Sequence, residues 1–169
     1  TAEAVGHLTA MVDDPSASVS ERLAAAEALA ECGAAERRAA ARGLRAVLAN
    51  PLASGYACRT AAVVLAAFGP AERAFAVDAL TRLTTDDETP PADLVEAATG
   101  LVEIGAEFHE HGAEVFRAVL RDPVDSTTGR RDAALGLASL GPDHAAEAAE
   151  HLTALATDQR RSTYDRAAV

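Results

Sequence analysis

The stretch His109-Glu110-His111, with Glu107 and Glu114 nearby, is the part of the sequence that most resembles a metal site. Two histidines at i and i+2 lie on different sides of a helix, whereas helical zinc sites favour a spacing of i and i+4. Glu107 with His111, and Glu110 with Glu114, do have that i, i+4 spacing, which leaves a weak adventitious site open. We interpret the stretch as a solvated helix start and predict no bound metal.

Other reactive groupings point to no catalytic site. Cys32 and Cys58 lack the C-x-x-C spacing of redox and zinc motifs, and a disulfide between them is not expected in a chain of cytosolic character. The sequence has no Ser/His/Asp grouping and no glycine-rich phosphate loop. We therefore predict a protein that is not an enzyme and holds no cofactor.

Charge and composition restrict the class of partner. The 169 residues carry 15 Lys+Arg against 26 Asp+Glu, a formal net charge of −11, which disfavours sequence-independent nucleic-acid binding. The longest apolar run, residues 61–68, is far below the length of a membrane span, and no secretory segment opens the chain. We predict a cytoplasmic protein. Its 43 Ala and its exclusive use of Arg as the basic residue suit closely packed helices.

A repeat of 36 residues organises the chain, marked by Gly33, Gly69, Gly105 and Gly141. Four residues before each glycine stands a leucine, and seven and eight before it stand two alanines. Eleven and fourteen residues after the glycine the positions are again apolar, as in two helices divided by a glycine turn. The residue before each glycine is also apolar or cysteine, which predicts that Cys32 is a small buried hydrophobe.

The repeat divides the chain into four units of two helices each. The units are 16–51, 52–87, 88–123 and 124–159, with a partial second helix at 1–15 and the start of a first helix at 160–169. Candidate N-caps of the first helices are Ser18, Ser54, Ser126 and Ser162, again 36 residues apart, while Thr89 is the expected cap in the third unit. A single pair of short helices buries too little apolar surface alone, so the units must stack.

The segment RTAAVVLAAFGPAERAFAVDALTRLTTD, residues 59–86, resembles the HEAT-like repeats of bacterial proteins. This resemblance covers nearly the whole chain and implies an all-α, right-handed solenoid of stacked antiparallel helix pairs. Tetratricopeptide repeats are a competing interpretation. Their period of about 34 residues and their Trp-containing pattern do not fit.

Some proteins with HEAT-like folds are enzymes, so the resemblance requires a comparison with their motifs. HEAT-like deoxyhypusine hydroxylases place His-Glu pairs near the first-helix starts, where this chain has Ala24-Ala25, Thr60-Ala61, Glu96-Ala97 and Asp132-Ala133. HEAT-like alkylpurine DNA glycosylases use a basic groove with Trp, and this chain is acidic and has no Trp. A HEAT-like enzyme or cofactor-binding module of the bilin-lyase or metal-dependent kind stays open as an alternative, as does a structural spacer between domains.

Arginines on the second helices are the candidate binding residues. In solenoids of this class the second helices line the inner curve, and the positions expected to face away from the core include five arginines. These partner-binding candidates are Arg38, Arg42, Arg45, Arg82 and Arg117, with Arg37 adjoining the first cluster. We predict that this face docks an acidic segment of another protein or of a neighbouring domain through bidentate arginine contacts.

The remaining arginines and the partial repeats at the two ends lead to two further predictions. Four arginines near first-helix starts are predicted to pair with acidic turns between units, such as Asp86, Asp122 or Asp158: these are Arg59, Arg130, Arg131 and Arg166. The partial repeats at both ends predict a segment of a longer array, able to self-associate through uncapped ends. The predicted function is a non-enzymatic interaction scaffold or sensor segment.

Overall fold

The computed structural model describes the backbone of residues 2–122 and 127–167, and the side chains of these residues up to position 157. Within these ranges the protein is all-α, with nine α-helices, one 3-10 helix and no strand. The helices are α1 (Ala2–Asp13), α2 (Val19–Cys32), α3 (Arg37–Leu48), α4 (Gly55–Ala66), α5 (Pro70–Thr85), α6 (Pro91–Ile104), η1 (Ala106–Phe108), α7 (His109–Arg121), α8 (Thr127–Ser139) and α9 (Pro142–Ala167).

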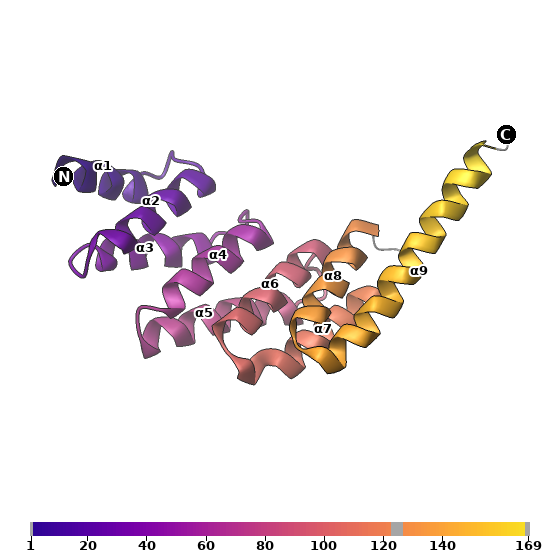
Figure 1. The fold of residues 1–169 in the computed structure, drawn as a ribbon. Coiled ribbons are helices and arrows are strands. Elements are labelled where there is room, and N and C mark those ends of the chain that lie inside the picture. Colours follow the sequence, from indigo (N-terminus) through magenta and orange to yellow (C-terminus); the bar gives the residue numbers. More distant parts are fainter. Residues whose placement is uncertain (1, 123–126, 168–169) are drawn as a thin grey trace.

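The helices form one elongated row, in which each α-helix packs against the next along the chain (Figure 1). The even-numbered helices, which we call the first helices, also contact one another in the order α2, α4, α6 and α8. Among the odd-numbered second helices, α3 contacts both α1 and α5. The most extensive contact between any two helices joins α4 to α6, and the contact of α6 with α8 is much smaller. None of the helices in the described ranges has the length and apolar character of a membrane span.

The repeated apolar positions form the core. The leucines four residues before each turn glycine are all fully buried: Leu29, Leu65, Leu101 and Leu137. On the second helices the equivalent positions of three units are fully buried as well, in Leu44, Leu80 and Phe116. The alanine pairs beneath them let the helix backbones approach closely, so the core is thin and depends on contacts between units.

Two of the predicted N-caps are confirmed. Ser18 accepts a hydrogen bond from the Glu21 amide while Glu21 bonds back to Ser18, a capping box, and Ser54 accepts from the Ala57 amide. The prediction for Thr89 is wrong, because α6 begins after Pro90, which makes no side-chain cap. Proline supplies a suitable backbone angle at a helix start without any cap. Ser126 lies outside the described residues.

Three of the four turn glycines have a positive φ angle. The φ angles of Gly33, Gly69 and Gly141 are 145°, 130° and 135°, which side chains with a Cβ rarely adopt. Gly105 differs, with an extended φ of −177°. Here the chain passes into η1, a short helix that the sequence analysis did not predict, and this path needs no left-handed residue.

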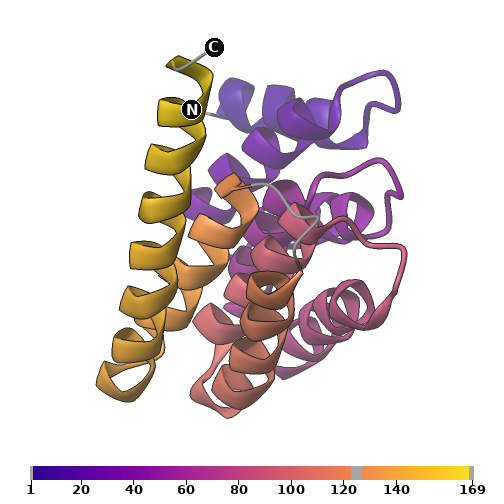
Figure 2. The same cartoon turned by 90° about the vertical axis from the view of Figure 1, so that its right-hand side faces the viewer.

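The structure also differs from the predicted end of the array. α9 continues without a break through 160–167, where the sequence analysis placed the start of a new first helix at Ser162. Proline follows shortly after the ends of α1 and α3, in Asp14-Pro15 and Asn50-Pro51, whereas Asp158-Gln159 has no proline at the equivalent point of α9. The carboxyl-terminal part of α9 consequently extends beyond α8 (Figure 2).

Candidate functional site: two polar faces of the helix row

Two of the predicted binding arginines tie second helices together. Arg42 of α3 forms an ion pair with Asp13 of α1 at 3.2 Å. Arg45 donates from Nε to Glu72 of α5 at 2.8 Å, and its guanidinium lies over the Phe75 ring, 4.8 Å from the centroid. Both side chains therefore already have partners within the chain, one on each neighbouring second helix.

The same arrangement recurs one unit later, at a residue that the sequence analysis did not select. Arg73 of α5 pairs with Glu107 of η1, and its guanidinium lies 5.7 Å from the centroid of the Phe108 ring. A hydrogen bond from its own backbone and the Arg73 guanidinium together lower the pKa of Glu107. An arginine with a carboxylate and an aromatic ring in the next unit thus forms a repeated tie, which the 36-residue pattern does not reveal because the spacings differ.

Arg117 makes a fourth tie, from α7 to α9. It donates to both carboxylate oxygens of Glu147 and to Nδ1 of His144. The hydrogen bonds from Arg117 lower the pKa of Glu147, and the same contact raises the pKa of Arg117. This bidentate contact joins the third unit to the fourth.

The other two predicted binding residues differ from these. Arg82 forms an exposed i, i+4 ion pair with Asp78 on its own helix. Arg38 and its neighbour Arg37, at the start of α3, are exposed. Within the described side chains these two arginines form no ion pair. The five predicted residues are distributed over the three second helices α3, α5 and α7.

The histidines and cysteines lie apart from one another. His111 Nε2 and the Thr84 hydroxyl are hydrogen-bonded at 2.8 Å, and the described residues contain no group of three potential metal ligands. Both cysteines are free thiols. Cys58 is buried, which raises its pKa, whereas Cys32 is exposed at the end of α2, so the prediction that Cys32 is buried is wrong. As the last residue of its helix, Cys32 lies beyond the face that packs on α3.

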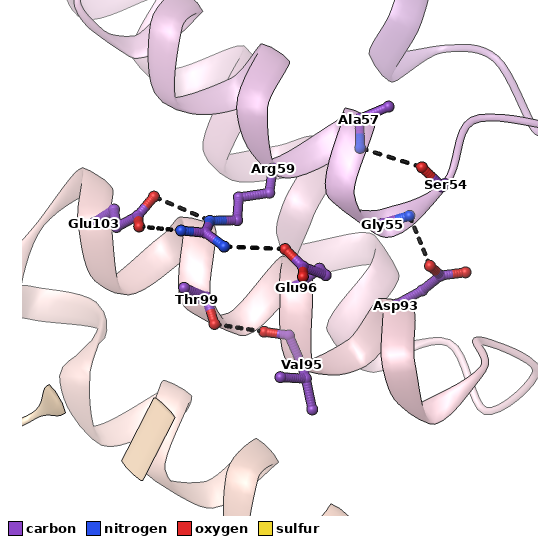
Figure 3. A network of polar contacts seen from close by, with 9 residues as sticks. All are labelled: Ser54, Gly55, Ala57, Arg59, Asp93, Val95, Glu96, Thr99 and Glu103. Atoms are coloured by element: carbon purple, nitrogen blue, oxygen red, sulfur yellow. Dashed lines mark hydrogen bonds and ion pairs between the residues drawn. The ribbon is translucent and has the colours of Figure 1, made fainter. Parts of the chain in front are cut away.

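The first-helix face carries a separate polar network, centred on Arg59 of α4 (Figure 3). The Arg59 guanidinium lies between Glu96 and Glu103, about two turns apart on α6, and pairs with both. The hydrogen bonds that Arg59 donates to Glu103 and Glu96 raise the pKa of Arg59 against the opposing effect of its partial burial. Arg59 therefore pairs with the next first helix, not with an acidic turn as predicted. Among the described side chains, Arg131, in the same repeat position as Val95, pairs with the adjacent Asp132.

The start of α4 is also fixed against α6. The Gly55 amide donates to Oδ1 of Asp93 at 2.6 Å, and a Cβ at Gly55 would lie 2.6 Å from the Asp93 Cα. Ser54 caps the same helix end, so the amino-terminal turn of α4 has both a local and an inter-unit acceptor (Figure 3). Glycine permits this close backbone approach.

A groove opens where α8 lies beside α6. It has a volume of about 560 Å³ and continues, across the shared Val95, Glu96 and Asp132, into a hollow of about 230 Å³ beside Tyr56. Its floor is largely apolar, while its walls carry four carboxylates and one guanidinium: Asp93, Glu96, Glu103, Asp132 and Arg59. Leu135 and Tyr56, two of the large apolar side chains that are exposed, border it. Sequence reasoning missed this groove because it followed the second helices.

No protein-family model, no curated protein and no solved structure matches the chain.

Proposed function

We propose that the chain is a non-enzymatic protein-interaction scaffold or sensor segment, built as a right-handed α-solenoid of HEAT-like repeats. The row of consecutively packed helices and the repeated burial of equivalent positions support this proposal. Such arrays present long helical faces on which partners dock. Two free thiols suit a reducing compartment, and we place the protein in the cytoplasm.

The amino-terminal turn of α3 is the proposed docking surface for an acidic segment of a partner. Arg37, Arg38 and Arg42 lie on a helix that has four arginines and no acidic residue. Cations in the first turn oppose the helix dipole and cost about 0.3–1 kcal/mol each. Among the described side chains, neither Arg37 nor Arg38 forms an ion pair that would offset this cost. Folding stability therefore gives no reason for these two charges, and this single observation carries the proposal.

The remaining predicted arginines act in a different way in this proposal. Arg45 and Arg117 hold neighbouring units together, and Arg82 pairs within its own helix. Only Arg38, Arg37 and, after exchange with Asp13, Arg42 are available to an incoming carboxylate. The surface is thus smaller than the sequence analysis predicted and lies at one end of the row.

An acidic, fluorescently labelled peptide tests this surface. The double variant Arg37→Gln/Arg38→Gln should weaken binding about tenfold, because two charge-assisted contacts are lost. The same variant should raise the free energy of unfolding slightly, since it removes two cations from a helix start. The matched control is Arg82→Gln/Arg131→Gln, which removes equal charge from two exposed side chains. Equal weakening by both double variants would show that binding depends only on the net charge of the protein, and would overturn the proposed surface.

An enzyme or a spacer is the alternative function. Turnover or a bound cofactor in the purified protein would establish the first. For the second, replacing the segment in its parent protein by an unrelated solenoid of equal length should leave activity unchanged. Retained activity in that exchange would contradict the scaffold proposal directly.

A further inference from the structure

The groove between α6 and α8 can be compared, position by position, with the contact between α4 and α6 one unit earlier. Arg59, Glu96 and Glu103 form the ion-pair network between α4 and α6. Moved along by 36 residues, their positions are held by Val95, Asp132 and Ser139. All three of these residues line the groove. The acidic position is therefore kept in Asp132, while the arginine that faces it is replaced by valine.

With valine in place of arginine, the groove between α6 and α8 has one positive charge fewer than the contact between α4 and α6. Across the α4–α6 contact the guanidinium of Arg59 lies between two carboxylates of α6 and pairs with both (Figure 3). Across the α6–α8 contact, Val95 is too short to reach Asp132, and the groove remains open. Asp132 has only its exposed neighbour Arg131 as a partner among the described side chains. Glu96 and Glu103 border the same groove and share the single charge of Arg59.

The groove also offers apolar contacts. Leu135 is 53% exposed at its edge and Tyr56 is 62% exposed at its far end, so both side chains are accessible to a partner. Val95, Val102 and Gly136 also line it. A Cβ at Gly136 would lie 2.6 Å from the buried Phe116 ring, so this position has no room for a larger residue.

We propose that the groove between α6 and α8 binds an apolar, arginine-bearing helical segment of a partner protein, whose guanidinium takes the place that Arg59 has one unit earlier. Four carboxylates against one guanidinium make the walls complementary to a basic segment and repel an acidic one. The chain's own α4 shows that a helix with one arginine and small apolar neighbours fits against this type of face. This site is distinct from the α3 arginines and prefers the opposite charge.

A labelled helical peptide with leucine at every third or fourth position and arginine beside it is the probe. Asp132→Asn and Leu135→Ser should each weaken its binding about fivefold, because the first removes a carboxylate of the groove and the second removes an aliphatic contact. Glu150→Gln is the control for charge, since it removes one exposed carboxylate from α9, outside the groove. Thermal unfolding of each variant should resemble that of the unchanged protein.

Peptide variants sharpen the test. Replacing arginine by lysine should weaken binding, because lysine cannot make bidentate contacts, and replacing it by glutamate should abolish binding. The variant Arg37→Gln/Arg38→Gln should bind this peptide normally, which separates failure here from failure of the α3 surface. Equal effects of Asp132→Asn and Glu150→Gln, or no effect of Leu135→Ser, would indicate non-specific attraction and overturn the proposal.

Discussion

The contact between α4 and α6 and the contact between α6 and α8 use the same repeat positions with opposite results. In the first, Arg59 bridges two carboxylates and Gly55 lets the backbones meet, so the helices pack extensively. In the second, Val95 takes the place of the arginine, and a groove of about 560 Å³ remains. Core positions thus set where the helices lie, while boundary positions determine whether an ion pair bridges the two helices.

The largest expected effect concerns what the two contacts share. Leu101→Ala in α6 and Leu137→Ala in α8 each empty a fully buried position and should lower the free energy of unfolding by about 3 kcal/mol. Urea denaturation measures this value. Leu52→Ala, at a side chain that is 88% exposed, is the matched control and should change stability by less than about 0.5 kcal/mol. A much smaller effect of Leu137→Ala would show that the fourth unit does not share the core.

The next effect separates the two contacts. Arg59→Met keeps the aliphatic stem but removes the bridge to Glu96 and Glu103, and should cost about 1 kcal/mol. Arg131→Met removes an exposed pair with the adjacent Asp132 and should cost about 0.3 kcal/mol or less. Both values come from the same urea titrations. Equal costs would contradict the distinction between a closed and an open contact.

The smallest effect concerns the ion pair between Arg117 of α7 and Glu147 of α9, which joins the third unit to the fourth. The pKa of Glu147 is lowered in the folded state from its ordinary 4.5. The stabilisation from its pair with Arg117 is therefore complete above that ordinary value and is lost as the pH falls through the lowered folded value. Glu147→Gln should cost about 0.5 kcal/mol at neutral pH and nothing at strongly acidic pH. Thermal unfolding of both proteins across this range measures the difference, and a constant difference would contradict the assignment.

The sequence predicted the helices well and their surface contacts poorly, for physical reasons. Gly33, Gly69 and Gly141 mark turns because local backbone geometry alone requires them. Buried leucines recur because each unit must cover the next. By contrast, the long side chains of Arg45, Arg73 and Arg117 reach partners 27, 34 and 30 residues away, so no fixed spacing identifies their pairs.

The groove was hidden from the sequence for a related reason. Val95 is one of many apolar helix residues in the sequence. Its role at the groove is recognised only when its position is compared with that of Arg59 in the contact between α4 and α6. The continuation of α9 likewise depended on the absence of a helix breaker at a place where the period favoured a turn. Periodicity identified positions, whereas the size and charge of neighbours in space determined what those positions do.

The most direct test of this account is a double-mutant cycle with Val95→Arg and Ser139→Glu. Together these substitutions rebuild, between α6 and α8, the bridge that Arg59 makes with Glu96 and Glu103 between α4 and α6. If positions 36 residues apart are equivalent in space, the free energy of unfolding should show a favourable coupling of about 1 kcal/mol between the two new residues. A coupling of zero would contradict that equivalence.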